Sequence, residues 1–272
     1  FVDVAGTAHA TAIRQAVQAG VTDGFPDGSF RPGEPVIRGQ MASLLARLLS
    51  RVVASGGTQL AAYNAIDRDA LAEVICQPNI GDVTRAERLM EGRYHFGPHP
   101  EVELGTDLSW DEDPLEDNNW RFQLHAMRWL RSLINATEET GDPRYLDHAY
   151  AMARDWVRSN PFHDPAGDFA WNDHSTAWRA QVLGCLQMQG PPPGWLTDAM
   201  AEHRDRLADP DFYVHHGNHA LNQDSGMLAV ACLTHAWDVR DLAMERIGVL
   251  VRASVDRQGV SNEQSVEYQD YN

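Results

Sequence analysis

Apolar residues recur at helical spacing through most of the 272-residue chain, and this pattern constrains the fold more than any other feature of the sequence. The clearest case is 142–159, where Asp142 is placed to cap a helix and Pro143 to open it. The apolar face of that helix consists of Tyr145, Ala149, Met152, Ala153, Trp156 and Val157. Further helices are expected at about 58–75, 83–91, 119–136, 171–189, 195–207, 219–237 and 240–255. Because strand signals are scarce, we predict an all-α fold of antiparallel helix pairs.

The first 51 residues form a separate pattern of two helices around a glycine-rich turn. One apolar stripe ends at Gly20, Asp27-Gly28 makes a tight turn, and a second stripe begins near Arg38. A unit of ~50 residues with two helices buries little apolar surface, so we expect it to need neighbouring repeats. The next segment, 52–81, contains Ser55-Gly56-Gly57 and is predicted to be a linker with short helices.

The charge balance is strongly acidic. Thirty-nine Asp and Glu residues face 22 basic residues, all of them Arg, and the net charge is −17. This balance argues against general nucleic-acid binding. It would also repel a polyanionic sugar at long range, so a site for one must depend on local Arg, His and Asn side chains. No stretch approaches the ~18 apolar residues that a membrane span needs.

The three cysteines are Cys76, Cys185 and Cys232. They are far apart, odd in number and without the spacing of metal ligands. We expect each to be a small buried residue rather than a disulfide or metal partner. The chain opens with Phe1 and closes at Asn272 inside a patterned segment, which indicates part of a longer protein.

Two blocks place aromatic and basic residues near expected helix starts. The block at 117–130 contains Trp120 and His125, and the block at 171–183 contains Trp171, His174 and Arg179. A tryptophan beside polar groups can stack on a sugar ring, and an arginine can hold a carboxylate through two hydrogen bonds. Core packing of the tryptophans and a structural salt bridge of Arg179 remain open alternatives.

The block HHGNHALNQDSGMLAVA at 215–231 is the richest in polar side chains. Its polar residues are His215, His216, Asn218, His219, Asn222, Gln223 and Asp224. One Asn or Asp would suffice to cap the helix that follows, so the excess predicts a functional site. His215, His216 and His219 could form a zinc set, but they do not fit the H-E-x-x-H pattern and no flanking carboxylate completes it. We therefore predict no metal.

The last block, SNEQSVEYQDYN, carries Tyr268 and Tyr271. A tyrosine is a poor base near pH 7 unless neighbouring cations or hydrogen bonds lower its pKa. These two are therefore either catalytic or ordinary interfacial aromatics.

Residues 1–51 resemble an S-layer homology repeat. The resemblance rests on FVDV, HATAI, the G-x-x-x-G-x-x-D-G-x-F-x-P turn and IRGQMASLLARLL. It implies a small helical module that tethers an exported protein to cell-wall polysaccharide. Localisation at the cell surface or cell wall, after secretion, is the expectation. On the residues alone, Asp3, Arg31 and Arg38 could equally be capping and turn residues.

The segment from about 80 to 272 resembles the heparinase II/III-like polysaccharide lyases, which include alginate lyases. The motifs are W-x-x-x-L-H from Trp120, TGDPRYLDHAYAMARDWVRSNP, Trp171 to Arg179, GNHALNQDSG, and E-x-S-x-x-Y-x-x-Y from Glu263. The resemblance implies that 82–272 is an incomplete α/α toroid, followed in whole proteins by a β-sandwich that this sequence lacks. It also implies β-elimination on a uronic-acid-containing acidic polysaccharide, without a cofactor.

Carried over by position, Asn218 and His219 would neutralise the uronate carboxylate, and Tyr268 or Tyr271 would remove the proton at ring position five. We favour Tyr268. The departures from the family pattern are Gln269 and Leu124-His125. The residues expected to bind the substrate are Trp120, His125, Trp171, His174, Arg179 and Gln223. We expect Trp120, His125, Trp171, Arg179 and Asn218 to line one groove, and His219 to lie near a tyrosine.

Two rival functions remain open. A glycoside hydrolase on a similar helical scaffold would need two carboxylates across the scissile bond. The candidates are Asp173, Asp224, Glu263 and Glu267. The other rival is a wall-anchored carbohydrate-binding protein without catalytic activity.

Overall fold

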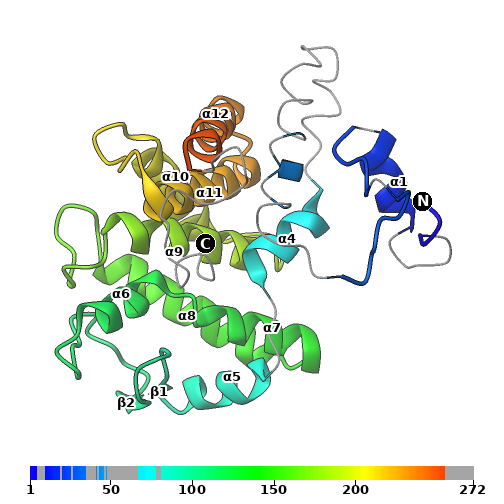
Figure 1. The fold of residues 1–272 in the computed structure, drawn as a ribbon. Helices are drawn as coiled ribbons and strands as arrows, with labels where there is room; N and C mark the ends of the chain where they lie inside the picture. The colour runs from blue at the N-terminus through cyan, green and yellow to red at the C-terminus, as the bar shows by residue number, and fades with distance from the viewer. Residues whose placement is uncertain are drawn as a thin grey trace. The chain divides into compact units, whose positions relative to one another are not determined.

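The computed structural model describes residues 1–4, 10–18, 20–25, 27–34, 41, 43–45, 47, 67–77 and 81–254 (Figure 1). The chain divides into two compact units. One unit comprises Phe1–Ala65 with Glu245–Asn272, and the other is Ile66–Met244. The glycines expected to mark the linker, Gly56 and Gly57, lie outside the described residues. The proposed boundary at 52–81 therefore stays a prediction.

In the smaller unit, helix α1 (Ala10–Gln18) precedes a turn held together by Asp3. The Asp3 carboxylate accepts hydrogen bonds from the backbone N–H groups of Phe30, at 2.9 Å, and Arg31, at 2.6 Å. Arg31 pairs with Asp27 at 2.9 Å and lies over the Phe25 ring. Gly28 has φ +79°, which explains the glycine in this turn. Asp3 and Arg31 therefore act as turn residues here, while Arg38 lies outside the described residues.

The larger unit consists mostly of helices, which confirms the all-α prediction. It contains α4 (Arg68–Cys76), α5 (Asp82–Met90), α6 (Asn118–Ala126), α7 (Leu130–Thr140), α8 (Pro143–Ser159), α9 (Asp173–Gln187), α10 (Gly194–Ala208), α11 (Gly217–Leu233) and the start of α12 (Trp237–Ser254). Two short strands, β1 (Arg93–Tyr94) and β2 (Val102–Glu103), pair antiparallel. No described helix is long and apolar enough to cross a membrane.

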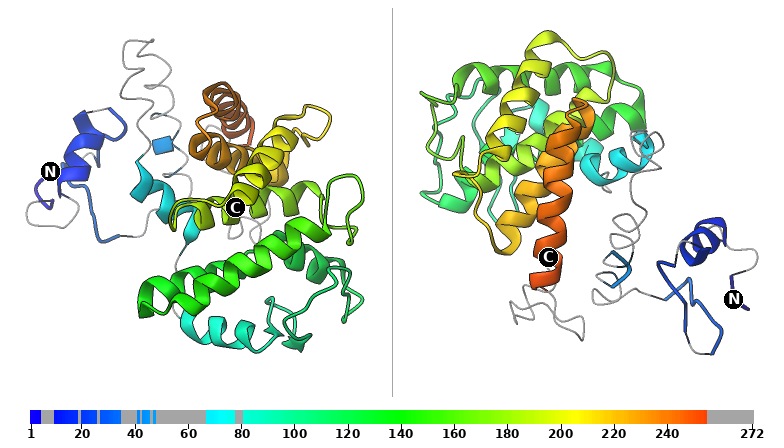
Figure 2. Two further views of the ribbon diagram at one scale, coloured as in Figure 1. Left: turned by 180° about the vertical axis from the view of Figure 1, so that it is seen from behind. Right: turned by 90° about the horizontal axis from the view of Figure 1, so that it is seen from above.

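Helix α9 lies at the centre of this unit, and its side chains are buried on nearly all sides. It packs against α4, α6, α10 and α11 (Figure 2). A helix with apolar or small side chains on every face is stable only when other elements surround it. Ala177 and Ala180, both fully buried, give those neighbours room to approach. The buried core of the unit therefore forms around α9.

Helices α6, α9 and α11 run parallel. Phe122 stacks on His174 near the start of α9, and farther along the same pair of helices the His125 carbonyl accepts from Arg179. Between α9 and α11, Asp173 contacts His219 at the helix starts, and Gln187 donates to the Leu233 carbonyl at the helix ends. Helix α10 carries the chain back between α9 and α11. As a result, the first turns of α9 and α11 lie at the same end of the bundle.

Gly226 makes the close contact between α9 and α11 possible. A Cβ atom at this position would lie 2.5 Å from the backbone oxygen of Ala177, which is closer than any side chain can approach. The absence of a side chain at 226 therefore brings the helix starts together, and with them the polar residues of the 215–231 block.

The predicted helix at 119–136 is wrong, because it is two helices. Helix α6 ends at Ala126, its C-cap residue Met127 has φ +55° in the left-handed region, and α7 begins at Leu130. A non-glycine residue in that region is uncommon, and the local sequence gives no breaker signal. This break redirects the chain at Arg128.

The expectation for the cysteines is also wrong for two of them. Cys76 of α4 and Cys185 of α9 form a disulfide across a sequence separation of 109 residues. The packing of α4 on α9 brings them together, and spacing along the chain gives no sign of that contact. Cys232 is a free, half-buried thiol, as expected of a small packed residue.

Candidate functional site

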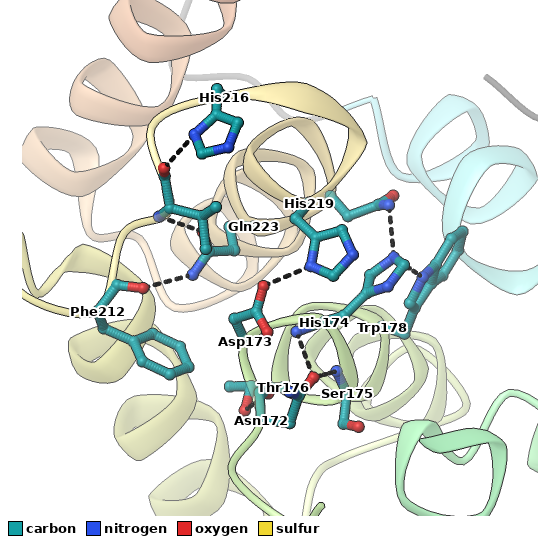
Figure 3. A network of polar contacts seen from close by, with 12 residues as sticks. Asn172, Asp173, His174, Ser175, Thr176, Trp178, Phe212, His216, His219 and Gln223 are labelled. Carbon is teal, nitrogen blue, oxygen red and sulfur yellow. Dashed lines mark hydrogen bonds and ion pairs between the residues drawn. The ribbon is translucent and has the colours of Figure 1, made fainter. Parts of the chain in front are cut away.

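The centre of the candidate site is a pair formed by His219 of α11 and Asp173 of α9 (Figure 3). Nδ1 of His219 lies 2.6 Å from Oδ2 of Asp173, and the two side chains are 44% and 18% exposed. An ionised carboxylate can only accept a hydrogen bond, so Nδ1 carries the proton. Nε2 is then the nitrogen that a ligand could reach. The carboxylate fixes the orientation of the imidazole, as in acid–base sites.

His174 lies beneath His219, with ring centroids 4.2 Å apart. Its Nε2 accepts a hydrogen bond from the indole N–H of Trp178 at 3.0 Å and lies 2.8 Å from Nδ2 of Asn222. Because an indole nitrogen is only a donor, Nε2 of His174 carries no proton. Burial lowers the pKa of His174 to about 4, with a smaller contribution from His219. His174 is thus a neutral support that holds Asn222 beside His219.

The first turn of α11 is open at its N-terminus. The N-cap residue is His216, and its side chain makes no capping hydrogen bond to the first amides of the helix. Asn218 is half-buried in this turn, directly before His219. By contrast, Asn172 caps α9 by accepting from the amides of His174 and Ser175. Uncapped amides and the helix dipole favour a negatively charged group at the start of α11.

Gln223 and Asp224 hold the loop before α11 in place. Gln223 is fully buried, accepts from the Val214 N–H at 2.9 Å and donates to the Phe212 carbonyl at 3.0 Å. Asp224, also fully buried, accepts from the Tyr213 hydroxyl. These contacts explain part of the excess of polar residues in the block. Gln223 is buried beneath the site, and Asp224 cannot serve as a surface carboxylate of a hydrolase.

Arg179 is fully buried below the site. Its guanidinium lies 3.6 Å from the centroid of the Trp156 ring, Nε donates to His203, and Nη1 donates to the His125 carbonyl at 2.7 Å. The arginine therefore joins α9 to α6, α8 and α10. In the part of the chain that the structure describes, it makes no salt bridge of the kind that we considered as an alternative, and its full burial keeps it from a cleft where it could bind a carboxylate.

The other expected binding residues also lie inside the core. Trp120 is fully buried against Phe96, so its ring has no face for a sugar. His125 accepts from Trp156 at Nδ1, and burial lowers its pKa to about 3. Trp171 is half-buried, donates to the Asn160 carbonyl and packs on His203. The prediction of one groove lined by Trp120, His125, Trp171, Arg179 and Asn218 is therefore wrong.

Several predicted residues lie outside the described part of the chain. These are Tyr268, Tyr271, Glu263 and Glu267. Their distances from Asn218 and His219 remain predictions. Of the four carboxylates considered for a hydrolase, the structure describes only Asp173 and Asp224, and Asp173 is paired with His219.

The histidines of the 215–231 block do not converge on a common point. Nδ1 of His216 contacts the Val214 carbonyl, the His215 ring packs on Tyr213, and His219 faces Asp173. Within the described ranges, no group of three or more His, Cys, Asp or Glu residues is arranged to hold a metal ion.

A separate depression of about 710 Å³ lies along α8 and α10. Its lining includes Phe162, Trp195 and Glu202 and carries several further carboxylates. It includes neither His219 nor Asn218. Because its charge is mainly negative, it suits an anionic ligand poorly, and we place the candidate site at the starts of α9 and α11.

Sequence reasoning missed two features of the site. It treated Asp173 as a cap or a hydrolase acid, although its partner is His219. It also left Asn222 and Trp178 without a role, although both contact His174. The available signal was the parallel arrangement of inner helices in a toroid, which brings the 171–183 and 215–231 blocks to one end.

Two parts of the chain match known protein families. Residues 68–191 match the family model described as heparinase II/III N-terminus, and residues 1–42 match the S-layer homology domain. The two resemblances predicted from motifs are therefore confirmed.

Two curated relatives are named heparin-sulfate lyase. The one from Bacteroides stercoris is 25% identical over 158 residues, which is 49% of this chain and 24% of the relative. The one from Pedobacter heparinus is 28% identical over 140 residues, which is 47% of this chain and 21% of the relative. The aligned segments thus span about a quarter or less of those relatives' length.

Solved structures of similar fold include a mutant of the heparan sulfate lyase HepC from Pedobacter heparinus, with a TM-score of 0.60 and 20% identity over 97% of this chain and 40% of that chain. A heparinase III structure matches with a TM-score of 0.59 and 17% identity, covering 97% of this chain and 41% of the other. At this identity the likeness establishes the fold, which is the helical part of these lyases, as predicted.

Proposed function

We propose that the protein is a polysaccharide lyase that cleaves a uronic-acid-containing acidic polysaccharide by β-elimination. The observation that carries this proposal is His219, held by Asp173 beside Asn218 at the uncapped start of α11. This site lies in a chain with the fold of heparan sulfate lyases, and its relatives are named heparin-sulfate lyase.

In the proposed reaction, the substrate carboxylate binds at the start of α11. A proton next to a carboxylate is weakly acidic, so its removal requires hydrogen bonds that strengthen as negative charge builds up on the carboxylate. Asn218 supplies an amide donor. His219, when protonated, donates from Nε2 while Asp173 accepts from Nδ1 and balances its charge. The His174 ring packs against the imidazole of His219 from below, and Asn222 contacts His174.

A tyrosine, Tyr268 or Tyr271, would complete the reaction. The phenolate takes the proton from ring position five, the freed electron pair forms a double bond to ring position four, and the bond to the glycosidic oxygen breaks. The same phenol then returns the proton to the leaving oxygen. In the whole protein, Tyr268→Phe should abolish unsaturated product. Full activity in Tyr268→Phe would transfer the role to Tyr271, and full activity in the double variant would exclude a tyrosine base.

We also propose that the protein acts outside the cell, attached to the cell wall. Residues 1–42 match the S-layer homology domain. The Cys76–Cys185 disulfide supports the same conclusion independently, because such bonds persist in oxidising compartments. The expected partners are the cell wall, through this module, and the polysaccharide substrate.

Product analysis separates this proposal from its rivals. The whole protein would be incubated with heparan sulfate, heparin and alginate. A lyase produces an unsaturated uronide that absorbs in the near ultraviolet together with new reducing ends. A hydrolase produces reducing ends without the absorbance, and a binding protein produces neither, so either of those results would contradict the proposal.

A further inference from the structure

A cluster of two arginines lies next to the candidate site, around the ring of Trp178. The guanidinium carbon of Arg128 lies 4.6 Å from the centroid of this ring, and that of Arg131 lies 5.6 Å from it. Nη2 of Arg128 donates to Oε1 of Gln123 at 3.0 Å, which directs the side chain back along α6. Both arginines follow Met127, where the chain passes from α6 to α7.

Within the described ranges, Arg131 is a buried cation that meets amides rather than carboxylates. It is 6% exposed, and its guanidinium donates to the side-chain oxygens of Gln77, at 2.7 Å, and Gln181, at 3.3 Å. Burial, with a smaller contribution from Arg128, lowers its pKa to about 9. Burying a cation without a carboxylate partner is costly. In a chain with a net charge of −17, this cost indicates that positive charge is needed at this place.

The cluster is continuous with the site. Trp178 donates to Nε2 of His174 at 3.0 Å, and the His174 ring lies 4.2 Å from that of His219. Arg128 is half-buried and close enough to contribute to the lowered pKa of His174. A chain of direct contacts therefore links His219 to Arg128 on one side of α9. A ligand at His219 would have its neighbouring part near Arg128.

We propose that Arg128, held against Trp178, binds a second anionic group of the polysaccharide, on the sugar next to the one whose carboxylate lies at Asn218 and His219. This inference rests on the proposed function. The guanidinium fork suits a sulfate or a carboxylate, and the buried charge of Arg131 strengthens the local field behind it. The subsite offsets at short range the repulsion that the acidic surface exerts on a polyanion.

The test compares Arg128→Gln with Arg144→Gln in the whole protein. Arg144 is exposed at the start of α8 and pairs with Asp142, so its variant matches the charge change away from the site. Binding to immobilised heparin is measured by the salt concentration of elution, and KM and kcat are measured on heparan sulfate and on its desulfated form. Circular dichroism checks that both variants are folded, and Arg128→Lys provides a folded alternative that keeps the charge and loses the fork.

We expect Arg128→Gln to elute at lower salt and to raise KM about tenfold or more, with kcat nearly unchanged, as loss of a charge-assisted contact in ground-state binding does. Arg144→Gln should match the parent. A loss confined to the sulfated polymer identifies a sulfate, and an equal loss on both polymers identifies a carboxylate. Equal behaviour of the two variants, or no binding of either polymer by the parent, would overturn the subsite. Binding without unsaturated product would instead overturn the proposed function.

Discussion

The Asp173 carboxylate lies 2.6 Å from Nδ1 of His219, although 46 residues separate the two in the sequence. The contact exists because α9 and α11 run parallel and begin at the same end of the bundle. It fixes which nitrogen of His219 faces a ligand, and it connects the 171–183 block to the 215–231 block. The remaining polar residues of the site are arranged around this pair.

The first prediction concerns Asp173. In Asp173→Asn, the amide can no longer balance a charged imidazole, so His219 loses both its orientation and its counter-charge. We expect kcat for unsaturated product to fall on the order of tenfold to a hundredfold, with smaller changes in KM. Asp147→Asn, at an exposed position on α8, is the matched control. Unchanged kcat in the Asp173 variant would show that the pair has no catalytic role.

The second prediction concerns Gly226. An added Cβ would lie 2.5 Å from the Ala177 oxygen, and the backbone there cannot move without separating α9 from α11. Gly226→Ala should therefore lower the free energy of unfolding by about 1–3 kcal/mol and reduce activity as His219 moves away from Asp173. Gly190→Ala meets no atom within 4 Å and serves as the control. Chemical denaturation and initial rates provide the measurements, and equal stability of the two variants would refute the packing argument.

The third prediction concerns the disulfide. Reduction, or replacement of Cys76 and Cys185 by Ala, should lower the free energy of unfolding by about 2–4 kcal/mol, because the bond closes a long loop in the unfolded chain. Thiol titration under denaturing conditions should find one free thiol before reduction and three afterwards. Three free thiols in protein purified from an oxidising compartment would contradict the pairing.

The fourth prediction concerns pH. Burial holds the pKa of His174 at about 4 and that of His125 at about 3, below their ordinary value of 6.5. Below pH 6.5 these histidines bind protons in the unfolded chain but stay neutral in the folded chain. The free energy of unfolding therefore falls as the pH drops from 6.5 toward 4. His174→Asn should make this fall less steep between pH 7 and pH 5. If the free energy of unfolding depends on pH equally in parent and variant, the pKa of His174 is not lowered by folding.

Much of the fold could be predicted because its signals are local. Asp142 and Pro143 define the start of α8, which was expected at 142–159 and runs from Pro143 to Ser159. The break at Met127 could not be predicted, because Met127 adopts a left-handed backbone through its tertiary surroundings rather than through its own preference. The Cys76–Cys185 bond was missed for the same reason, since it depends on the packing of α4 on α9.

The site could be predicted in part. The surplus of polar residues at 215–231 indicated Asn218 and His219 as candidates, and both lie in the first turn of α11, while their role stays a proposal. Arg179 and Trp120 were misjudged because an isolated arginine or tryptophan gives no sign of whether it faces solvent. Arg179 instead donates to His203 and to a helix-end carbonyl, and it stacks on Trp156 in the core.

The role of His219 in the elimination is tested most directly by the rate of unsaturated product formation by His219→Ala in the whole protein. The near-ultraviolet absorbance of the product would be followed on the polysaccharide that the parent cleaves, with His95→Ala, at an exposed position after β1, as the matched control. We expect the rate to be lower by on the order of a hundredfold or more for His219→Ala, because a donor to the developing charge is lost, and close to that of the parent for His95→Ala. A full rate in His219→Ala would show that His219 takes no part in the elimination.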